Sequence, residues 1–267
     1  MLRVNNIDGP SEGSVPSTIL YQNGTHKNVL LEDFLQGEKA VQANQHIIVH
    51  GNAAILLDPG GHKVYSKALS ATMSEIGKAK LTHLFLSHED PDILAALNGW
   101  LMTTDAVAYS SDLWMRFIPH FGLDRMVADR LVGIPDRGMV LNLDGLKLLV
   151  LPAHFLHSSG NHQIYDPESK ILYSGDLGAS LGHQYIEVPD FDEHIRFMKG
   201  FHVRYMSARR ATQNWAKMVR QLDIEVIAPQ HGAMMRGKEM VQRFIDWCES
   251  LECGVDVLDD VYQIPTE

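Results

Sequence analysis

The chain has 267 residues and a formal net charge of −10, because 33 acidic residues outnumber 23 basic ones. A chain of this length buries roughly three quarters of its unfolded surface, so it needs no disulfide staples. The acidic balance argues against nucleic acid as a partner, since a phosphate backbone is bound by a basic face.

Signals for membranes or export are not evident in the sequence. It has no apolar run of 18 or more residues, and its N-terminus lacks the basic-then-apolar pattern of a signal peptide. Cys248 and Cys253 form one C-x4-C pair without a second pair, which favours two reduced structural thiols over a zinc or redox site. We therefore expect a cytoplasmic protein without a membrane partner.

The first half of the chain is predicted to alternate strands with turns before the first helices. Residues 1–17 are polar and rich in Gly and Pro, which predicts an irregular start. The later elements follow from apolar alternation, helical spacing and turn residues. Strands are expected at residues 18–21, 28–31, 40–49 and 53–57, a helix at 64–76, a strand, turn and helix over 83–102, a strand at 106–109 and a helical stretch at 111–121.

The second half repeats this arrangement. Its predicted elements are strand pairs at 139–143 with 146–151 and 163–165 with 171–173, helices at 190–199 and 211–222, a strand at 225–228 and a helix at 238–250. Strand meanders followed by strand–helix alternation, twice over, predict an α/β fold in which two mixed sheets pack face to face with helices outside. We expect residues 1–267 to form one domain.

A polar motif, His88-Glu89-Asp90-Pro91-Asp92, lies between a short apolar strand and a helical pattern. Side chains at positions i, i+2 and i+4 cannot share one face of a helix, but they converge from an extended loop. Pro91 favours such a loop because it holds Asp90 outside the α region. The alternative is structural, with Asp90 as an N-cap and Asp92 as an acid favoured by the helix dipole.

Three further candidates each follow the end of a predicted strand: His157, Asp176 and His231. Each has an ordinary alternative as a loop or turn residue, and His154 and His162 compete with His157 by position. Six candidate ligands beyond strand ends are nevertheless what a two-metal site requires, because the carboxyl ends of strands are where open α/β sheets place their chemistry.

These residues resemble the metallo-β-lactamase fold, a four-layer αβ/βα sandwich, and within it the diiron branch of the flavodiiron proteins. That branch has the pattern His-x-acid-x-Asp, a later His, an Asp after eighteen intervening residues, and a final His; here residues 158–175 separate His157 from Asp176. The segment Asp58-Pro59-Gly60-Gly61 matches an early turn of the fold. This sequence departs from the family patterns at two positions. It has Asp90 where flavodiiron proteins usually carry Glu, and Ile93 where zinc hydrolases of the fold carry His.

The resemblance implies a specific division of the ligands between two iron ions. One metal takes His88, Asp90 and His157, the other takes Asp92 and His231, and Asp176 bridges them. Three carboxylates among the six ligands favour harder ions such as iron or manganese over zinc. The chain carries no flavodoxin module that would bind FMN, so it looks most similar to the stand-alone oxygen-binding diiron proteins, whose described members act as oxygen sensors.

The expected function is therefore binding of O2, or of NO, as a sensor. Two ferrous ions provide two electrons, enough to hold oxygen as a peroxide adduct, whereas reduction to water needs four. One alternative is an O2 or NO reductase that receives electrons from a separate flavoprotein. Another is a dinuclear metallohydrolase, against which Asp90 and Ile93 count.

Partners and supporting residues are less narrowly defined by the sequence. A signalling protein or an electron-donating flavoprotein is expected as a partner, and a homodimer is an open alternative. Side chains near the motif that are candidates, by position alone, for supporting the ligands are Glu89, His154, Asn161, His162 and Tyr205.

Overall fold

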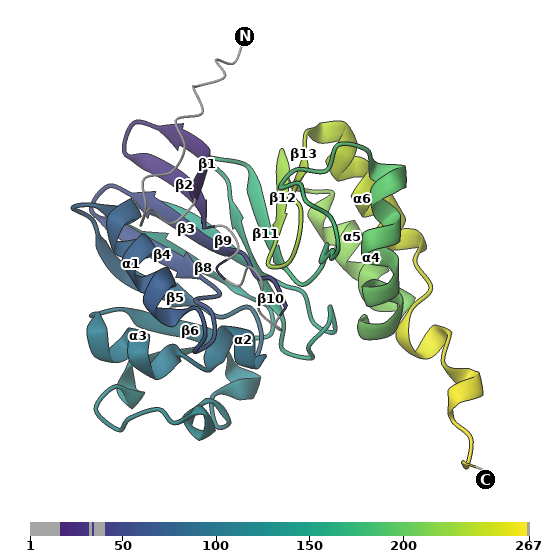
Figure 1. Cartoon of the computed structure of the whole chain (residues 1–267), viewed down its shortest axis with the longest axis horizontal. Helices are drawn as coiled ribbons and strands as arrows, with labels where there is room; N and C mark the ends of the chain where they lie inside the picture. The colour runs from purple at the N-terminus through teal and green to yellow at the C-terminus, as the bar shows by residue number, and fades with distance from the viewer. Residues whose placement is uncertain (1–16, 32–33, 35–40, 266–267) are drawn as a thin grey trace.

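The computed structural model describes residues 17–31, 34 and 41–265, arranged as two β-sheets between two layers of helices (Figure 1). The irregular start predicted for residues 1–17 falls, up to residue 16, outside the described residues, and so does residue 40 of the predicted strand 40–49. The first sheet contains, in spatial order, β1 Ser17–Asn23, β2 His26–Leu31, β3 Gln45–His50, β4 Ala53–Leu57, β5 Lys80–Phe85, β6 Val107–Ser111 and β7 Leu131–Ile134.

The second sheet has the spatial order β13-β12-β11-β10-β9-β8. Its strands are β8 Met139–Leu143, β9 Leu146–Pro152, β10 His162–Asp166, β11 Ile171–Gly175, β12 Val226–Pro229 and β13 Met235–Arg236. The α-helices are α1 Tyr65–Ile76, α2 Pro91–Leu94, α3 Leu97–Thr103, α4 Phe191–Tyr205, α5 Arg209–Val219 and α6 Lys238–Ser250. Short 3-10 turns are η1 Asp112–Trp114, η2 Ile118–Phe121, η3 Ala128–Arg130, η4 Gly254–Asp256 and η5 Asp259–Val261.

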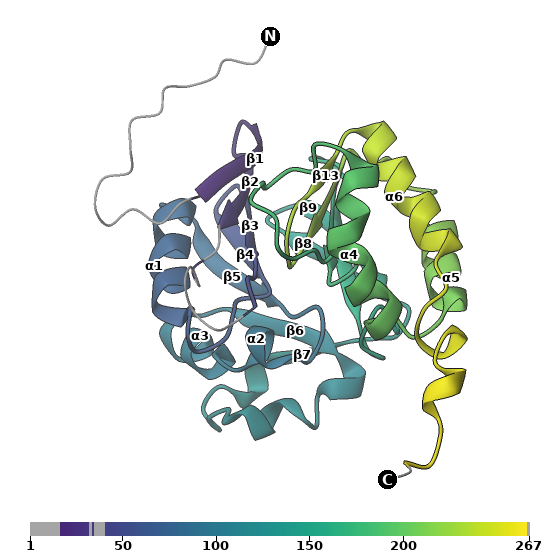
Figure 2. The same ribbon diagram turned by 45° about the vertical axis from the view of Figure 1, so that its right-hand side comes forward.

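Three apolar clusters separate the four layers. Trp100 and Leu84 belong to the cluster between α1–α3 and the first sheet. Ile55 and Ile164 belong to the cluster between the sheets, and Phe244 belongs to the cluster between the second sheet and α4–α6. Figure 2 shows α1–α3 on one side of the sheets and α4–α6 on the other. The predicted four-layer α/β sandwich is confirmed.

Strand direction brings the predicted ligands to one edge of the sandwich. β4 to β7 are parallel, so the loop after β5 leaves from the carboxyl edge of the first sheet. β11 and β12 are parallel in the second sheet, and β9 is antiparallel to β10, which is itself antiparallel to β11. The segments after β9, β11 and β12 therefore all start at the same edge of the second sheet.

Several element boundaries differ from the sequence predictions. Residues 41–44 of the predicted strand 40–49 are not strand. The backbone N–H of Asn44 donates to the carbonyl of Gln230, at 2.5 Å, and its side-chain amide donates to the carbonyls of Pro229 and Gly232, at 3.0 and 2.9 Å. The stretch 111–121 forms η1 and η2 rather than one helix, with a proline in the second. β7 and β13, which the pattern did not predict, are only four and two residues long.

The helices also differ in extent from their predictions. The helix expected within 83–102 is divided into α2 and α3, and α4 continues to Tyr205 instead of ending at residue 199. Across residues 17–31, 34 and 41–265, none of the helices has the length and apolar character that crossing a bilayer requires.

Candidate metal centre

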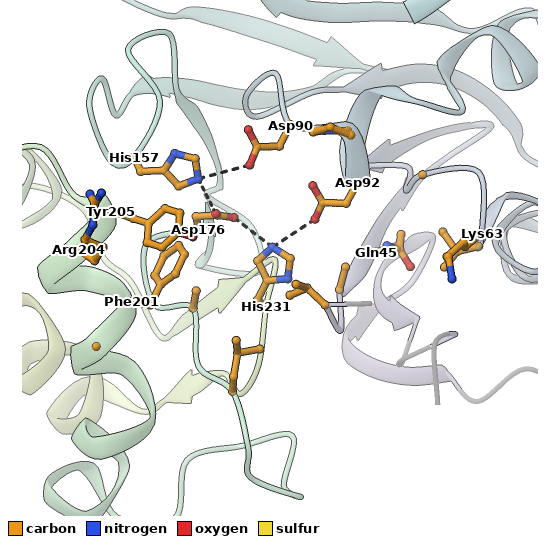
Figure 3. A pocket seen from close by; sticks show the side chains of 18 of the residues that line it. Gln45, Lys63, Asp90, Asp92, His157, Asp176, Phe201, Arg204, Tyr205 and His231 are labelled. Carbon is orange, nitrogen blue, oxygen red and sulfur yellow. Dashed lines mark ion pairs between the residues drawn. The ribbon is translucent and has the colours of Figure 1, made fainter. Parts of the chain in front are cut away.

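The structure brings all six predicted side chains to one place between the two sheets. His88 and Asp90 come from the turn between β5 and α2, and Asp92 comes from the first turn of α2. Asp90 is the extended N-cap residue of α2, and Pro91 takes the first helical position. The others follow β9, β11 and β12 in the second sheet. Figure 3 shows five of them, from His157 and Asp90 on one side to Asp92 and His231 on the other, with Asp176 between.

The first group consists of His88, Asp90, His157 and one oxygen of Asp176. Their candidate ligand atoms all lie within 4.8 Å of one another. The Nε2 atom of His157 is 2.9 Å from Oδ2 of Asp176 and 3.6 Å from Oδ2 of Asp90. The Nε2 atom of His88 lies 3.6 Å from the same Asp90 oxygen and 3.7 Å from the same Asp176 oxygen.

The second group is built around the other oxygen of Asp176. The Nε2 atom of His231 is 3.4 Å from Oδ1 of Asp176 and 3.4 Å from Oδ2 of Asp92. Asp176 therefore directs Oδ2 toward one His/Asp group and Oδ1 toward the other. A carboxylate in this position can share its two oxygens between two cations.

Hydrogen bonds orient two of the three imidazole rings. The Nδ1 atom of His88 is 2.9 Å from the hydroxyl oxygen of Ser87, and Nδ1 of His231 is hydrogen-bonded to the backbone carbonyl of Gln42. Each ring thus engages Nδ1 with the protein and presents Nε2 to the centre. Such contacts hold a ligating histidine in one orientation and tautomer.

Asp58 supports the same strand end from the neighbouring strand. Its Oδ1 accepts the backbone N–H of Ser87 at 2.8 Å, and its own backbone N–H donates to the carbonyl of Phe85 at 2.9 Å. Asp58 has a positive φ of 49°, in the turn after β4. Sequence reasoning identified this turn only as a match to the fold, and it did not identify Asp58, Ser87 or Gln42 as supports of the ligands.

Glu89 and Tyr205, two of the five candidate supporting residues, do contact the site. Glu89 accepts a hydrogen bond from the hydroxyl of Ser158 and so fixes the loop that carries His157. The ring of Tyr205 lies 5.6 Å from the ring of His157, measured between centroids.

The two other candidate histidines are hydrogen-bonded to backbone carbonyls of neighbouring loops. His154 is hydrogen-bonded to the carbonyl of Asp136, and His162 to the carbonyls of Pro135 and Gly160. Asn161 is fully buried, and its amide oxygen lies near Gly175, the residue before Asp176.

The charges of the cluster are mutually dependent. Burial opposes protonation of His88, but the carboxylates of Asp176 and Asp90 outweigh it and raise the pKa of His88 to about 10. Burial likewise acts to raise the pKa of Asp176, yet His88, His157 and His231 hold that pKa far below its usual range. Burial raises the pKa of Asp92 despite the nearby His231. The cluster thus keeps the buried carboxylate of Asp176 ionised beside the imidazole of His88.

Within the described part of the chain, two buried atoms at the centre of this cluster lack a hydrogen-bond partner: Nε2 of His88 and Oδ1 of Asp176. Leaving a buried donor or acceptor without a partner costs about 1–3 kcal/mol. Both atoms point to positions that a cation would occupy, and both residue types are metal ligands. The residues present therefore fit a pair of metal ions.

A cavity of about 800 Å³ opens onto the cluster. Asp90, Asp92, His157, Asp176 and His231 line its metal-facing end. The remaining wall is largely apolar and includes Val41, Ala43, Ala179, Leu181, Phe201 and Tyr205. Lys63 and Arg204 line it from opposite sides (Figure 3).

Comparison with known proteins defines the family. Residues 41–232 match the family described as "ODP family beta lactamase". The chain belongs to the ODP family. Its overlap with a peroxy diiron species of the chemotaxis sensor ODP covers 92% of this chain and 100% of that chain, with 38% identity and a TM-score of 0.82. The apo state of the chemotaxis sensor ODP from T. denticola matches with 37% identity, the same TM-score, and coverage of 93% of this chain and 100% of that one.

A more distant solved structure shares the fold of this ODP family member. A mutant flavo di-iron protein from Thermotoga maritima has a TM-score of 0.73 and 16% identity, covering 89% of this chain and 61% of that chain. An uncharacterized protein of Methanocaldococcus jannaschii is 22% identical in an alignment of 218 residues that covers 78% of this chain and 54% of that protein. The chain thus spans about half the length of this curated relative. The predicted resemblance to the metallo-β-lactamase fold and to diiron proteins is confirmed.

Proposed function

We propose that this protein holds two iron ions at the six-residue cluster and binds O2 there as an oxygen sensor. The observation that carries the proposal is the position of Asp176, whose two oxygens face two separate His/Asp groups. The similarity to a chemotaxis sensor in a peroxy diiron form, across the whole length of that sensor chain, supports the same function.

The proposed ligands fall into the same two His/Asp groups as the observed contacts. His88, Asp90 and His157 hold one iron, and Asp92 and His231 hold the other. Asp176 contributes one oxygen to each. Three carboxylates and three imidazoles form a harder ligand set than the histidine-rich sites that suit zinc, and this favours iron.

Position 93 supports this assignment over a hydrolase. Ile93 is fully buried and belongs to the apolar cluster between α1–α3 and the first sheet. It therefore lies in the core and offers no ligand atom. A hydrolase of this fold uses the histidine at that position, so the proposal does not assign hydrolysis to this chain.

The cavity supports binding of a small uncharged gas. Its wall carries Leu181, Phe201 and Tyr205, and the rings of Phe201 and Tyr205 stack with centroids 4.6 Å apart. An apolar wall favours O2 or NO over water next to the ligands. Ferrous iron bound at the cluster would supply two reducing electrons and open coordination positions.

The chain's own residues then hold the site in place during gas binding. Ser87 and Gln42 fix the rings of His88 and His231, and Glu89 fixes the loop of His157 through Ser158. Lys63 and Arg204 contribute positive charge along the cavity wall. Helix α4 carries both Phe201 and Arg204 of the cavity wall. A signalling partner that contacts α4 would therefore respond to changes at the cavity.

One observation favours a second candidate function. A volume of about 800 Å³ is at the upper end of the range for small-molecule sites and greatly exceeds what a diatomic gas fills. The cavity therefore leaves room for a planar redox group of a separate flavoprotein. With such a donor the same site would act as an O2 or NO reductase.

Metal content and oxygen uptake test the proposal. The protein is reconstituted anaerobically with ferrous iron, desalted, assayed for iron and zinc, and then mixed with O2 while visible absorbance and oxygen are recorded. We expect two irons per chain, a visible band that develops with oxygen, and uptake of one O2 per two irons. Zinc retained in place of iron, with no optical change, would contradict the proposal.

Two variants make the test specific. His231→Gln removes a ligand from one group only, so iron should fall from two to about one per chain and the oxygen-dependent band should disappear. His120→Gln is the matched control, because His120 is exposed in η2, outside the cluster. Steady oxygen consumption with a reduced flavoprotein would favour the reductase, and cleavage of an ester panel would favour the hydrolase.

A further inference from the structure

A second group of metal-ligating side chains lies at the opposite edge of the sheets. His26 begins β2 and His50 ends β3, and the two are register partners. Glu168 lies in the turn between β10 and β11 of the other sheet. One candidate ligand atom from each residue lies within 4.8 Å of the other two. Strand β5 runs from this edge to the edge that carries His88. It has six residues and is therefore about 20 Å long.

A buried carboxylate supports one of these histidines. The Oδ2 atom of Asp166 lies 2.8 Å from Nε2 of His26 and accepts hydrogen bonds from the side chains of Asn28, at 2.8 Å, and Ser169, at 2.7 Å. Asp166 and His26 are both almost fully buried. This carboxylate–imidazole contact is the arrangement that orients ligating histidines in many metal sites.

The contact with Asp166 determines which nitrogen of His26 is available. Asp166 acts as an acceptor, so Nε2 of His26 carries the proton, and Nδ1 of the neutral ring then carries the lone pair. That atom faces Nδ1 of His50 at 3.3 Å. The two nitrogens are within hydrogen-bond distance, so Nδ1–H of His50 donates to the lone pair on Nδ1 of His26, and a cation that replaced this proton would lie between the same two atoms.

The same separation fits two nitrogens bound to one tetrahedral ion. Nitrogen ligands about 2.05 Å from zinc, at a tetrahedral angle, are about 3.3–3.4 Å apart. The observed distance is 3.3 Å. Glu168 is exposed and His50 is partly exposed, so an ion can enter from solvent and keep a water ligand.

We propose that His26, His50 and Glu168 form a second metal site that binds one Zn²⁺ ion. Two imidazoles and one carboxylate are a zinc ligand set, with water completing four-coordination. His26 and His50 belong to the first sheet, whereas Glu168 and Asp166 belong to the end of the second. The ion therefore connects the two sheets at the edge away from the six-residue cluster and stabilises their packing.

Zinc binding to the iron-loaded full-length protein tests this site. The protein is loaded with iron, titrated with zinc chloride in a calorimeter, passed through a desalting column and assayed for both metals. We expect one zinc per chain in addition to an unchanged iron content, and a higher Tm than that of the iron-loaded protein without zinc.

Three variants assign the zinc to the proposed residues. Glu168→Gln and His50→Gln alter exposed or partly exposed side chains and leave the His26–Asp166 contact in place, so both should fold. Each should weaken zinc affinity at least tenfold and remove the rise in Tm, with iron content unchanged. His120→Gln, an exposed histidine in η2, should bind zinc as the parent does.

The proposal is overturned by any of three results. These are the absence of retained zinc on the iron-loaded parent, unchanged zinc affinity in both His50→Gln and Glu168→Gln, and a zinc gain that equals the iron lost. The last result would place the zinc at the six-residue cluster. All three are independent of whether the protein senses oxygen.

Discussion

The carboxylate of Asp58 lies 2.8 Å from the backbone nitrogen of Ser87, and the Ser87 hydroxyl lies 2.9 Å from Nδ1 of His88. A residue in the turn after β4 thus positions the first candidate ligand after β5. The same carboxylate acts electrostatically on the His88 imidazole, and burial raises the pKa of Asp58 to about 6.

Removing this support should weaken metal binding without removing a ligand. Asp58→Ala deletes the acceptor for the Ser87 N–H, and we expect iron affinity to fall about 10–100-fold, the usual effect of losing a partner behind a ligand. Asp58→Asn keeps an acceptor oxygen and should lose less. Competition with a chromogenic chelator measures both, and Asp129→Ala, at an exposed position in η3, serves as the control.

Neutralising the shared carboxylate should affect both metals. Asp176→Asn keeps the shape of the side chain but removes the charge that faces His88, His157 and His231. We expect iron to fall below one per chain, in contrast to the half-loss expected for His231→Gln. Metal analysis of the two variants side by side checks this, with circular dichroism as the test of folding. Equal iron content in both variants would contradict a shared role for Asp176.

Metal binding should release a proton near neutral pH. The pKa of His88 without metal is raised to about 10, above its usual 6.5, so His88 is protonated at pH 7–8. A metal displaces that proton, and apparent affinity should therefore rise with pH until about pH 10. Calorimetry in buffers of different ionisation enthalpy should detect about one proton released per chain at pH 7.5. The same enthalpy in every buffer would count against this.

Acid should destabilise the fold through buried neutral histidines. Burial lowers the pKa of His46 to about 3 and that of His194 and His202 to about 4, below the 6.5 of the unfolded chain. Because the unfolded state then binds more protons, the free energy of unfolding decreases as pH falls from about 6.5 toward 4, by up to about 1.4 kcal/mol per pH unit for each group.

A single substitution isolates one of these contributions. His46→Leu should reduce the slope of unfolding free energy against pH by about one proton between pH 4 and 6, measured with urea. His46 suits this test because its Nε2 has no hydrogen-bond partner among the described residues. His120→Gln, at an exposed position, should leave the slope unchanged.

Gly232 should not tolerate a side chain. Its φ is +82°, and a Cβ there would overlap the backbone and hydroxyl oxygens of Ser180. We expect Gly232→Ala to cost about 1–3 kcal/mol for the backbone conformation alone, and to displace the neighbouring His231. Gly200→Ala is the matched control, because a Cβ in that helical position meets nothing within 4 Å and should stabilise α4 by about 0.5–1 kcal/mol. Urea unfolding of both variants provides the measurement.

The order and spacing of the six candidate ligands could be predicted from the sequence. His88, Asp90 and Asp92 follow a buried strand, and His157, Asp176 and His231 each follow another, so strand prediction alone placed them at sheet edges. The four-layer architecture was also predictable, because apolar runs of strand and helix length set which faces must be covered. Short elements such as β13 were not, since two residues carry no periodic signal.

Tertiary structure decided which atoms meet. The family resemblance implied that Asp176 bridges two metals, but only the folded chain shows that its Oδ2 faces His157 and its Oδ1 faces His231. No pattern in the chain indicates that Asp58 holds the strand end beside His88. The cluster of His26, His50 and Glu168 likewise depends on strand register and on how one sheet packs over the other. Local sequence governs local conformation, whereas contacts between residues more than a hundred positions apart are selected by the packing of the whole core, and that packing is a property of the folded chain.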